Sequence, residues 1–487
     1  MKRISIQVLK TMLVAAIALP GLAGPASAQS TDFSRMTPEQ REAYMAKIRS
    51  ASRAEWQRAL DRQHIILPAL TAAAEDPLRP AGLSQRTPGS FAWYDAAGYT
   101  YVRSSWGGWS NYDETKADGY TLPNPLVLKN GQPVKDASTW RQLRRPEILK
   151  DYQDFIYGHI PAHTPGVHFD VIETDNNALN GKAIKKTIIG HIDNTRHPAD
   201  TPSIRITLYL PVAARTPVPL MVTVGGFLGP FPGARKDTMP TALDMVIAKG
   251  WAIGTVNTSA IQADNGAGLN EGIIGLVNEG KTRQPTDWGV LAAWSWGLSR
   301  ALDYFETEPM INKKQLGIEG HSRWGKTALL AAALDERWSI VYASCSGSMG
   351  ASLEKRNYGE TVGIVAGDGE FHWMAENFLQ YGGHPEAMPV DAHDLIALVA
   401  PRPAFITGGT HDSWADPKGE FLACVAAGPV YKLMGKKDLG TDVMPAPDAG
   451  LMNGELAFRL HEGGHTDLLD WPVFIEFAAR QWGLAVK

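Results

Sequence analysis

A serine framed by two glycines is the first candidate for chemistry in this sequence. Ser322 stands in GIEGHSRWGKTALL (residues 317–330), between the strand-like LGIE and the helix-like KTALL. Gly320 and Gly325 leave room for a sharp turn. Such a turn lifts the hydroxyl above a sheet and aims the N-terminus of the next helix at the reacting oxygen. The pattern predicts a nucleophile, and the alternative is an ordinary turn that contains a serine.

A candidate acid and a candidate base follow this serine along the chain. Asp412 and Asp416 stand in THDSWADP, after the strand-like RPAFITGG, and His465 stands in LHEGGHTD, in a turn framed by glycines. An imidazole can take the serine proton, and a carboxylate can orient the imidazole. We predict a triad of Ser322, His465 and Asp412, with Asp416 as the second choice for the acid.

Other histidines are weaker candidates for the base. His321 flanks the serine directly, and His461 lies on or at the end of a strand-like segment. The alternative for His465 is a surface histidine in a loop. The presence of a serine, an acid and a histidine after strands, in the chain order of a triad, favours the catalytic interpretation.

Strand-like and helix-like segments alternate from about residue 137 onward. Runs rich in β-branched residues predict strands at residues 185–192, 203–212 and 219–226. An amphipathic stretch predicts a long helix over residues 286–308, which we expect to be capped by Thr286 or Asp287. Alternation of this kind indicates a mainly parallel sheet with helices on both faces.

The chain order of serine, acid and histidine is that of the α/β-hydrolase fold. We therefore expect an α/β-hydrolase fold, with a mainly parallel sheet, helices on both faces and an N-terminal helical extension. The usual serine turn of this fold is G-x-S-x-G. Here the second glycine, Gly325, comes one residue later than that pattern requires.

The N-terminus has the form of an export signal. Lys2 and Arg3 precede an apolar run over residues 12–19, and an Ala-Ser-Ala sequence ends at Ala28. The apolar run is too short to span a bilayer. We expect residues 1–28 to be removed and the mature protein to be periplasmic or secreted, with no membrane span.

A helical segment follows this signal. Residues 36–75 are predicted to be helical, with Thr37 as the N-cap and Pro38 at the first helical position. We expect a helical and irregular extension over residues 29–105 and the catalytic domain over residues 106–487.

Composition and charge narrow the possible partners. The 487 residues are 44% hydrophobic and 20% charged, which is an ordinary globular composition, and the net charge is −4. This charge gives no reason to expect a nucleic acid or an anionic membrane as partner. Cys345 and Cys424 are too few for a disulfide framework or a structural zinc site, so we expect two free, buried thiols. We expect a monomer.

The serine motif is similar to the signature of a known family. GHSRWGK resembles the Gly-x-Ser-Arg-x-Gly-Lys motif of glucuronoyl esterases, carbohydrate esterase family 15. The late glycine is this family's own spacing. The resemblance extends over about residues 110–485, through NYGETV, GEFHWMAENF, PVDAHDLIALVAPRP, DSWADPKGEF and GGH.

The resemblance implies a reaction and a set of roles. Members of this family split the ester between the carboxyl group of a (4-O-methyl-)glucuronic acid branch of xylan and a lignin alcohol, with no metal or cofactor. Carried over, Ser322 is the nucleophile, His465 the base and Arg323 the oxyanion arginine. The implied sugar contacts are Lys326, Glu360, Glu370 and Trp414.

One position departs from the family's pattern. Many members carry the triad acid as a glutamate where this chain has Cys345, in SCSGSMG. A thiol orients an imidazole poorly, so the acid is expected at Asp412. Two alternatives stay open: an acetyl-xylan or other carboxylic esterase, and a catalytically weakened carbohydrate-binding homologue.

Overall fold

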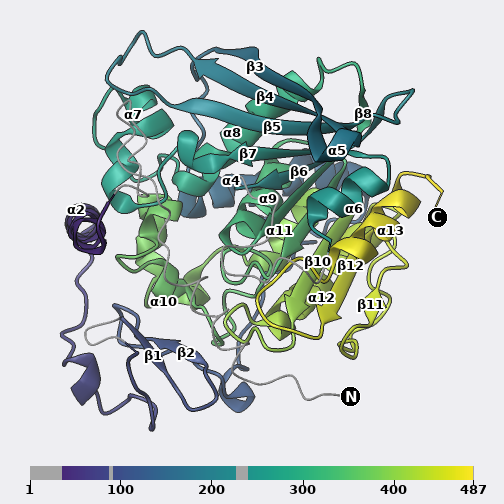
Figure 1. Cartoon of the computed structure of the whole chain (residues 1–487). Helices are drawn as coiled ribbons and strands as arrows, with labels where there is room; N and C mark the ends of the chain where they lie inside the picture. The colour runs from purple at the N-terminus through teal and green to yellow at the C-terminus, as the bar shows by residue number, and fades with distance from the viewer. Residues whose placement is uncertain (1–35, 87–90, 226–239, 486–487) are drawn as a thin grey trace.

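The computed structural model describes residues 36–86, 91–225 and 240–485 (Figure 1). The predicted export signal lies outside these residues.

A ten-stranded sheet forms the centre of the molecule. Its strands are β3 (Val167–Asn177), β4 (Ala183–Ile192), β5 (Ser203–Pro211), β6 (Val218–Val224), β7 (Ala252–Asn257), β8 (Ile311–His321), β9 (Ile340–Ser344), β10 (Ala404–Gly409), β11 (Gly450–Leu451) and β12 (Leu456–His461). Their order is β11-β12-β10-β9-β8-β6-β7-β5-β4-β3. The strands from β12 to β7 pair in parallel, whereas β5, β4, β3 and β11 are antiparallel to their neighbours. The predicted mainly parallel sheet is confirmed, and its antiparallel pairings lie at the two edges.

Helices cover both faces of this sheet (Figure 1). They include α6 (Ala242–Ala248), α8 (Val290–Phe305), α9 (Arg323–Leu334), α11 (Ala392–Val399), α12 (Pro417–Leu433) and α13 (Trp471–Gln481). Successive side chains of a strand point to opposite faces. In β6, Leu220 and Val222 join the core under α8, α9, α11 and α12, while Met221 joins the core under α6 and α13. The strands are therefore apolar on both sides.

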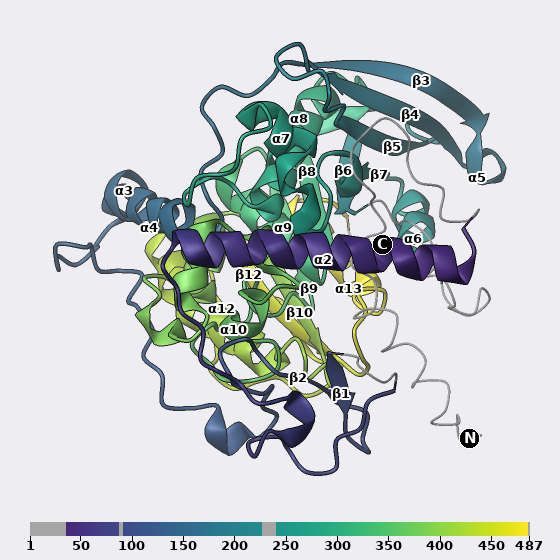
Figure 2. The same cartoon turned by 90° about the vertical axis from the view of Figure 1, so that its left-hand side faces the viewer.

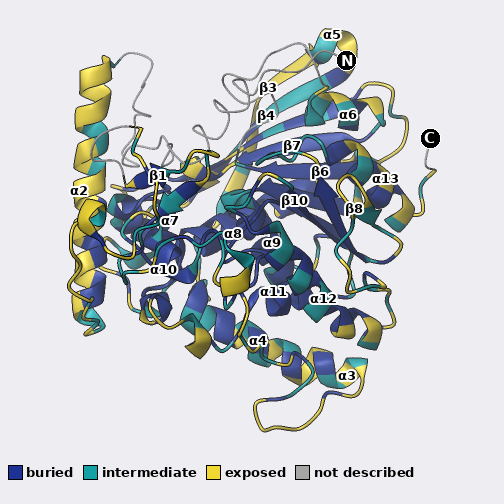
Figure 3. Cartoon of the chain, turned by 90° about the horizontal axis from the view of Figure 1, so that it is seen from below, coloured by how far each residue is buried: buried dark blue, intermediate teal, exposed yellow. Residues whose placement is uncertain are grey.

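The N-terminal helix lies outside the sheet layers. Helix α2 (Pro38–Arg62) starts with a capping box in which Thr37 and Gln40 exchange side-chain-to-backbone hydrogen bonds. It lies across the molecule in Figure 2, and its N-terminal half is largely exposed in Figure 3. The C-terminal half is anchored, because the Trp56 indole donates to the carbonyl of Ala366 at 2.9 Å.

Two predicted boundaries are wrong. The helix expected over residues 36–75 ends at Arg62, because the chain turns into a left-handed conformation at His64 (φ 56°). Helix α8 is capped by neither Thr286 nor Asp287 but begins after Gly289, where a Cβ would lie 2.3 Å from the carbonyl oxygen of Trp373. Close backbone approach therefore decides this start.

Two further expectations can be compared with the described residues. Cys345 and Cys424 are both free and buried, as predicted. None of the described helices combines the length and the apolar character needed to cross a membrane.

Candidate active site

Ser322 occupies a sharp turn between β8 and α9. Its backbone is in a strained region (φ 58°, ψ −129°) that non-glycine residues rarely adopt. The flanking glycines are required by space. A Cβ on Gly320 would lie 2.0 Å from the carbonyl oxygen of Trp324, and one on Gly325 would lie 3.0 Å from that of Gly320. The close backbone packing at these glycines therefore keeps Ser322 in its strained conformation at the tip of the turn, at the N-terminus of α9.

His465 and Asp412 form a hydrogen-bonded pair at neighbouring strand ends. Asp412 follows β10 and His465 follows β12, and Nδ1 of the histidine lies 2.6 Å from Oδ2 of the aspartate. The Asp412 side chain is 2% exposed and that of His465 is 11% exposed. With Nδ1 engaged as the donor, Nε2 carries the lone pair that could accept a proton.

The pair lies beside the serine turn. The ring of His465 lies 4.3 Å, centroid to centroid, from that of His321, the residue before Ser322. Within the described part of the chain no hydrogen bond joins the Ser322 hydroxyl to His465. Catalytic hydrogen bonds of this kind are often long before substrate binds and shorten in the substrate complex.

His321 is held in its neutral form. Its Nδ1 lies 3.3 Å from the hydroxyl of Ser344. Burial lowers the pKa of His321 well below its usual value, and the neighbouring His465 and His461 lower it further. A group that resists protonation cannot take the serine proton, which agrees with its place as a weaker candidate.

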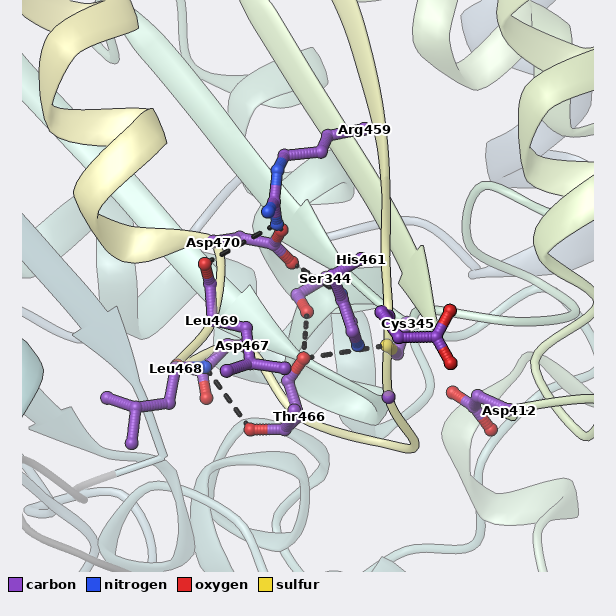
Figure 4. A network of polar contacts seen from close by, with 12 residues as sticks. Ser344, Cys345, Asp412, Arg459, His461, Thr466, Asp467, Leu468, Leu469 and Asp470 are labelled. Atoms are coloured by element: carbon purple, nitrogen blue, oxygen red, sulfur yellow. Dashed lines mark hydrogen bonds and ion pairs between the residues drawn. The ribbon is translucent and has the colours of Figure 1, made fainter. Parts of the chain in front are cut away.

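Cys345 lies beside Asp412 (Figure 4), and both lie close to His465. One ligand atom from each of the three residues lies within 4.8 Å of the others. Burial raises the pKa of the thiol well above its usual value, and Asp412 and Glu420 raise it further. The thiol is therefore protonated and uncharged, which makes it a poor metal ligand and a poor substitute for a carboxylate.

Arg323 is held by a carboxylate that the sequence did not reveal. Its Nη1 donates to Oδ2 of Asp264 at 2.6 Å, and Asp264 also accepts from Nε2 of His372 at 3.0 Å and from the indole of Trp373 at 2.6 Å. Burial alone would raise the pKa of Asp264, but Arg323 and His372 outweigh it and hold the pKa below its usual value. The only available signal was an acidic residue in the loop after β7.

Lys326 is buried, and its ammonium group has three hydrogen-bond acceptors. Its Nζ lies 2.6 Å from Oε2 of Glu360 and 2.8 Å from the carbonyl oxygen of Ser346, and it also donates to the carbonyl of Ser348. The predicted sugar contacts Lys326 and Glu360 thus form an ion pair with each other. This pair is buried rather than on the surface.

Glu370 lies close to the charged groups of Glu360, Lys326 and Arg323. Burial and, less strongly, Glu360 raise the pKa of Glu370 to about 8, against the opposing effects of Lys326 and Arg323. Its Oε2 is buried with no hydrogen-bond partner among the described residues. At neutral pH it is therefore a carboxylic acid that can donate as well as accept a hydrogen bond.

The last two predicted residues differ in their surroundings. Half-buried Trp414 adjoins Glu360, whose N–H donates to the tryptophan carbonyl at 2.9 Å. Asp416 accepts from the N–H of Gly419 at the start of α12 and pairs with Arg356 at 3.0 Å. Asp416 therefore shapes the start of a helix and is not bonded to the candidate base.

A serine turn at the end of β8, with a His–Asp pair at the ends of β10 and β12 in the same parallel sheet, defines an α/β-hydrolase.

A family model described as "Glucuronyl esterase, fungi" matches residues 194–435. Among curated proteins, a carbohydrate esterase named MZ0003, from an unknown prokaryotic organism, is 34% identical over 401 residues. The match covers 76% of this chain and 91% of the relative.

Solved structures agree with this match. A glucuronoyl esterase of family 15 from Teredinibacter turnerae superposes with a TM-score of 0.75 at 35% identity, covering 88% of this chain and all of that one. A glucuronoyl esterase from Solibacter usitatus gives 0.69 at 35% identity, covering 76% and 100%. The chain belongs to the glucuronoyl esterase family, carbohydrate esterase family 15, and is a carboxylic ester hydrolase.

Proposed function

We propose that this protein hydrolyses esters of (4-O-methyl-)glucuronic acid, such as those that join lignin alcohols to glucuronoxylan. The proposed catalytic residues are Ser322, His465 and Asp412, assisted by Arg323. The observation that carries the assignment is the 2.6 Å contact between His465 and Asp412, two buried or nearly buried groups beside the strained serine turn.

The reaction proceeds through an acyl-enzyme. The Ser322 oxygen attacks the ester carbonyl while Nε2 of His465 takes its proton. The C–O bond to the alcohol breaks, and the alcohol leaves with that proton. Water then attacks the glucuronoyl-serine, His465 takes the water proton, and the C–O bond to Ser322 breaks as the serine recovers its proton. Asp412 keeps His465 in the productive tautomer and stabilises the imidazolium in both steps.

Arg323 supports the proposed oxyanion site in two ways. It is the first residue of α9, so its backbone N–H has no partner within the helix. Its guanidinium is fixed by Asp264 and lies over the Trp373 ring, 5.3 Å from the centroid. A preorganised cation and a free N–H can both stabilise the negative oxygen of the tetrahedral intermediate.

The charged cluster beside the turn supports a sugar substrate. Glu360 and a protonated Glu370 offer acceptors and a donor that suit sugar hydroxyls, Lys326 holds Glu360 in place, and the Trp414 indole offers one more donor. Because the ester itself carries no charge, we expect recognition through the hydroxyl groups rather than through the carboxyl group.

Turnover of benzyl glucuronate, compared with acetylated xylan and an aryl acetate, tests this proposal. We expect benzyl glucuronate to be preferred. Ser322→Ala and His465→Ala should each lose several orders of magnitude in kcat while remaining folded. His411→Ala, at an exposed histidine two positions after β10, is the control and should keep full activity. Near-normal turnover by folded Ser322→Ala would end the serine-esterase assignment. A preference for acetylated xylan would instead indicate an acetyl-xylan esterase.

A further inference from the structure

A second histidine, His461, lies beneath the loop that carries His465. His461 is the last residue of β12, and its side chain is completely buried. Its Nδ1 lies 2.8 Å from Oδ2 of Asp470, and its Nε2 lies 2.8 Å from the carbonyl oxygen of Gly464. Gly464 is bonded directly to His465. The imidazole thus joins the backbone beside the candidate base to the start of α13.

Both partners of this imidazole are hydrogen-bond acceptors. A neutral imidazole carries one N–H and one lone pair, whereas the protonated form carries two N–H groups. With a neutral ring, one of the two 2.8 Å contacts would place a lone pair against an oxygen in a buried site. Only the imidazolium can donate to both the Asp470 carboxylate and the Gly464 carbonyl at once.

Asp470 is itself held in place. Arg459, on the same strand as His461, donates to Oδ1 of Asp470 and to the carbonyl of Leu469 at 3.4 Å, and its Nη2 pairs with Asp448 at 3.0 Å. Figure 4 shows Arg459, Asp470 and His461 in one connected network. The carboxylate therefore has a fixed cation on one oxygen and the histidine on the other.

The loop is held on the other side of His465 as well. The hydroxyl of Ser344 donates to the carbonyl of Thr466 at 3.5 Å, and the thiol of Cys345 makes a weak contact with the same oxygen at 3.9 Å (Figure 4). Gly409, at the end of β10, allows the close packing, because a Cβ there would lie 2.5 Å from the carbonyl oxygen of Gly464. The carbonyls on both sides of the base are thus hydrogen-bonded to strand ends.

We propose that His461 is a positioning residue that acts as a clamp, charged at neutral pH, which holds the Gly464 carbonyl and thereby the geometry of His465. This role rests on the proposed function of His465 as the base. His461 carries its charge and holds the loop, whereas His465 exchanges protons with the substrate.

The surroundings of His461 favour its charged form. Burial by itself would lower the pKa of His461, but Asp470 and the Gly464 carbonyl outweigh burial and the opposing effect of Arg459, so the pKa is raised above its usual value. The titratable and charged groups that act on it are Asp470, Arg459 and His321, and Asp470 itself interacts electrostatically with Asp467, Cys345 and Tyr342. Because the folded pKa is raised, the clamp is complete at low pH and is lost as pH rises through that pKa.

The first test needs no substitution. In the full-length protein with ¹⁵N-labelled histidine, NMR should show protons on both ring nitrogens of His461 at pH 7, above the ordinary histidine pKa of about 6.5. A single protonated nitrogen at or below pH 6.5 would overturn the proposal. This measurement is independent of activity, so it stands even if Ser322→Ala shows that the proposed function is wrong.

The second test is kinetic. His461→Gln should lower kcat on benzyl glucuronate by about 10²-fold, the effect of a misplacement near 1 Å, and leave KM within about twofold. In Asp470→Asn, the loss of kcat at alkaline pH should begin at a lower pH than in the wild type. His411→Gln should match the wild type in both respects. A folded His461→Gln protein with wild-type kcat and pH profile would refute the clamp, and the NMR titration decides the question if that variant does not fold.

Discussion

Replacing Asp412 by asparagine would remove the carboxylate that orients His465 while keeping the side chain's shape. The two side chains meet at 2.6 Å, and Asp412 is 2% exposed, so solvent cannot replace the lost contact. An imidazolium and a carboxylate with charge centres 4 Å apart attract by about 4 kcal/mol at an effective dielectric constant near 20. Losing this stabilisation corresponds to about 10³-fold in kcat.

A second effect adds to this loss. The asparagine amide can donate to Nδ1 and so favour the tautomer that cannot accept the serine proton, which brings the expected loss towards about 10⁴-fold. KM should change little, because Asp412 is buried behind the base. The assay is the turnover of benzyl glucuronate at one pH, with the melting temperature of each variant as a check on folding.

Cys345 supplies the matched comparison. Cys345→Ala should stay within about tenfold of the wild type, because a neutral thiol offers His465 no charge. Cys345→Glu should restore part of the activity lost in Asp412→Asn, since the sulfur already lies within 4.8 Å of the His465–Asp412 atoms. If Asp412→Asn keeps more than about a tenth of wild-type kcat, against the loss a triad predicts, or if Cys345→Ala is as damaging, Asp412 is not the acid.

Two further outcomes follow from the charged cluster. Asp264→Asn should lower kcat by about 10- to 100-fold by releasing Arg323, less than the loss of a whole oxyanion donor, and should add nothing in an Arg323→Ala background; additive losses would contradict this coupling. For Glu370, whose pKa is raised from its usual 4.5 to about 8, the folded state keeps a proton that the unfolded state has lost, so stability falls as pH rises across this window. Glu370→Gln should remove that fall, so its melting temperature should gain on the wild type from pH 5 to pH 8; a constant difference would show that Glu370 does not titrate there.

Strands β4, β5 and β6 could be predicted because they are rich in β-branched residues. Strand β3 could not, because it is an edge strand whose eleven residues are mostly exposed and lack a clear apolar alternation. The end of α2 was missed for another reason. Residues 63–75 contain good helix formers, but the chain leaves the helix at His64, before Pro68.

Some residues of the candidate site could also be predicted from the sequence, and others could not. Ser322, Asp412 and His465 could be placed from their order and from the strand ends that precede them. Asp264 and His461 could not, since their roles depend on side-chain contacts with residues far away or across a loop. The export signal, the boundary at residue 105 and the monomeric state remain predictions from the sequence.

The anchoring of α2 has a consequence for the timing of folding during synthesis. Trp56 binds a carbonyl 310 positions later, and Arg62 pairs with Glu376, 314 positions later. At about 5–20 residues per second, the ribosome needs roughly 15 to 60 s to supply these partners. Helix α2 emerges long before these partners, so Trp56 and Leu60, which are buried in the folded protein, stay uncovered for that time. The first described helix is thus among the last to dock, and a chaperone has this interval in which to bind it.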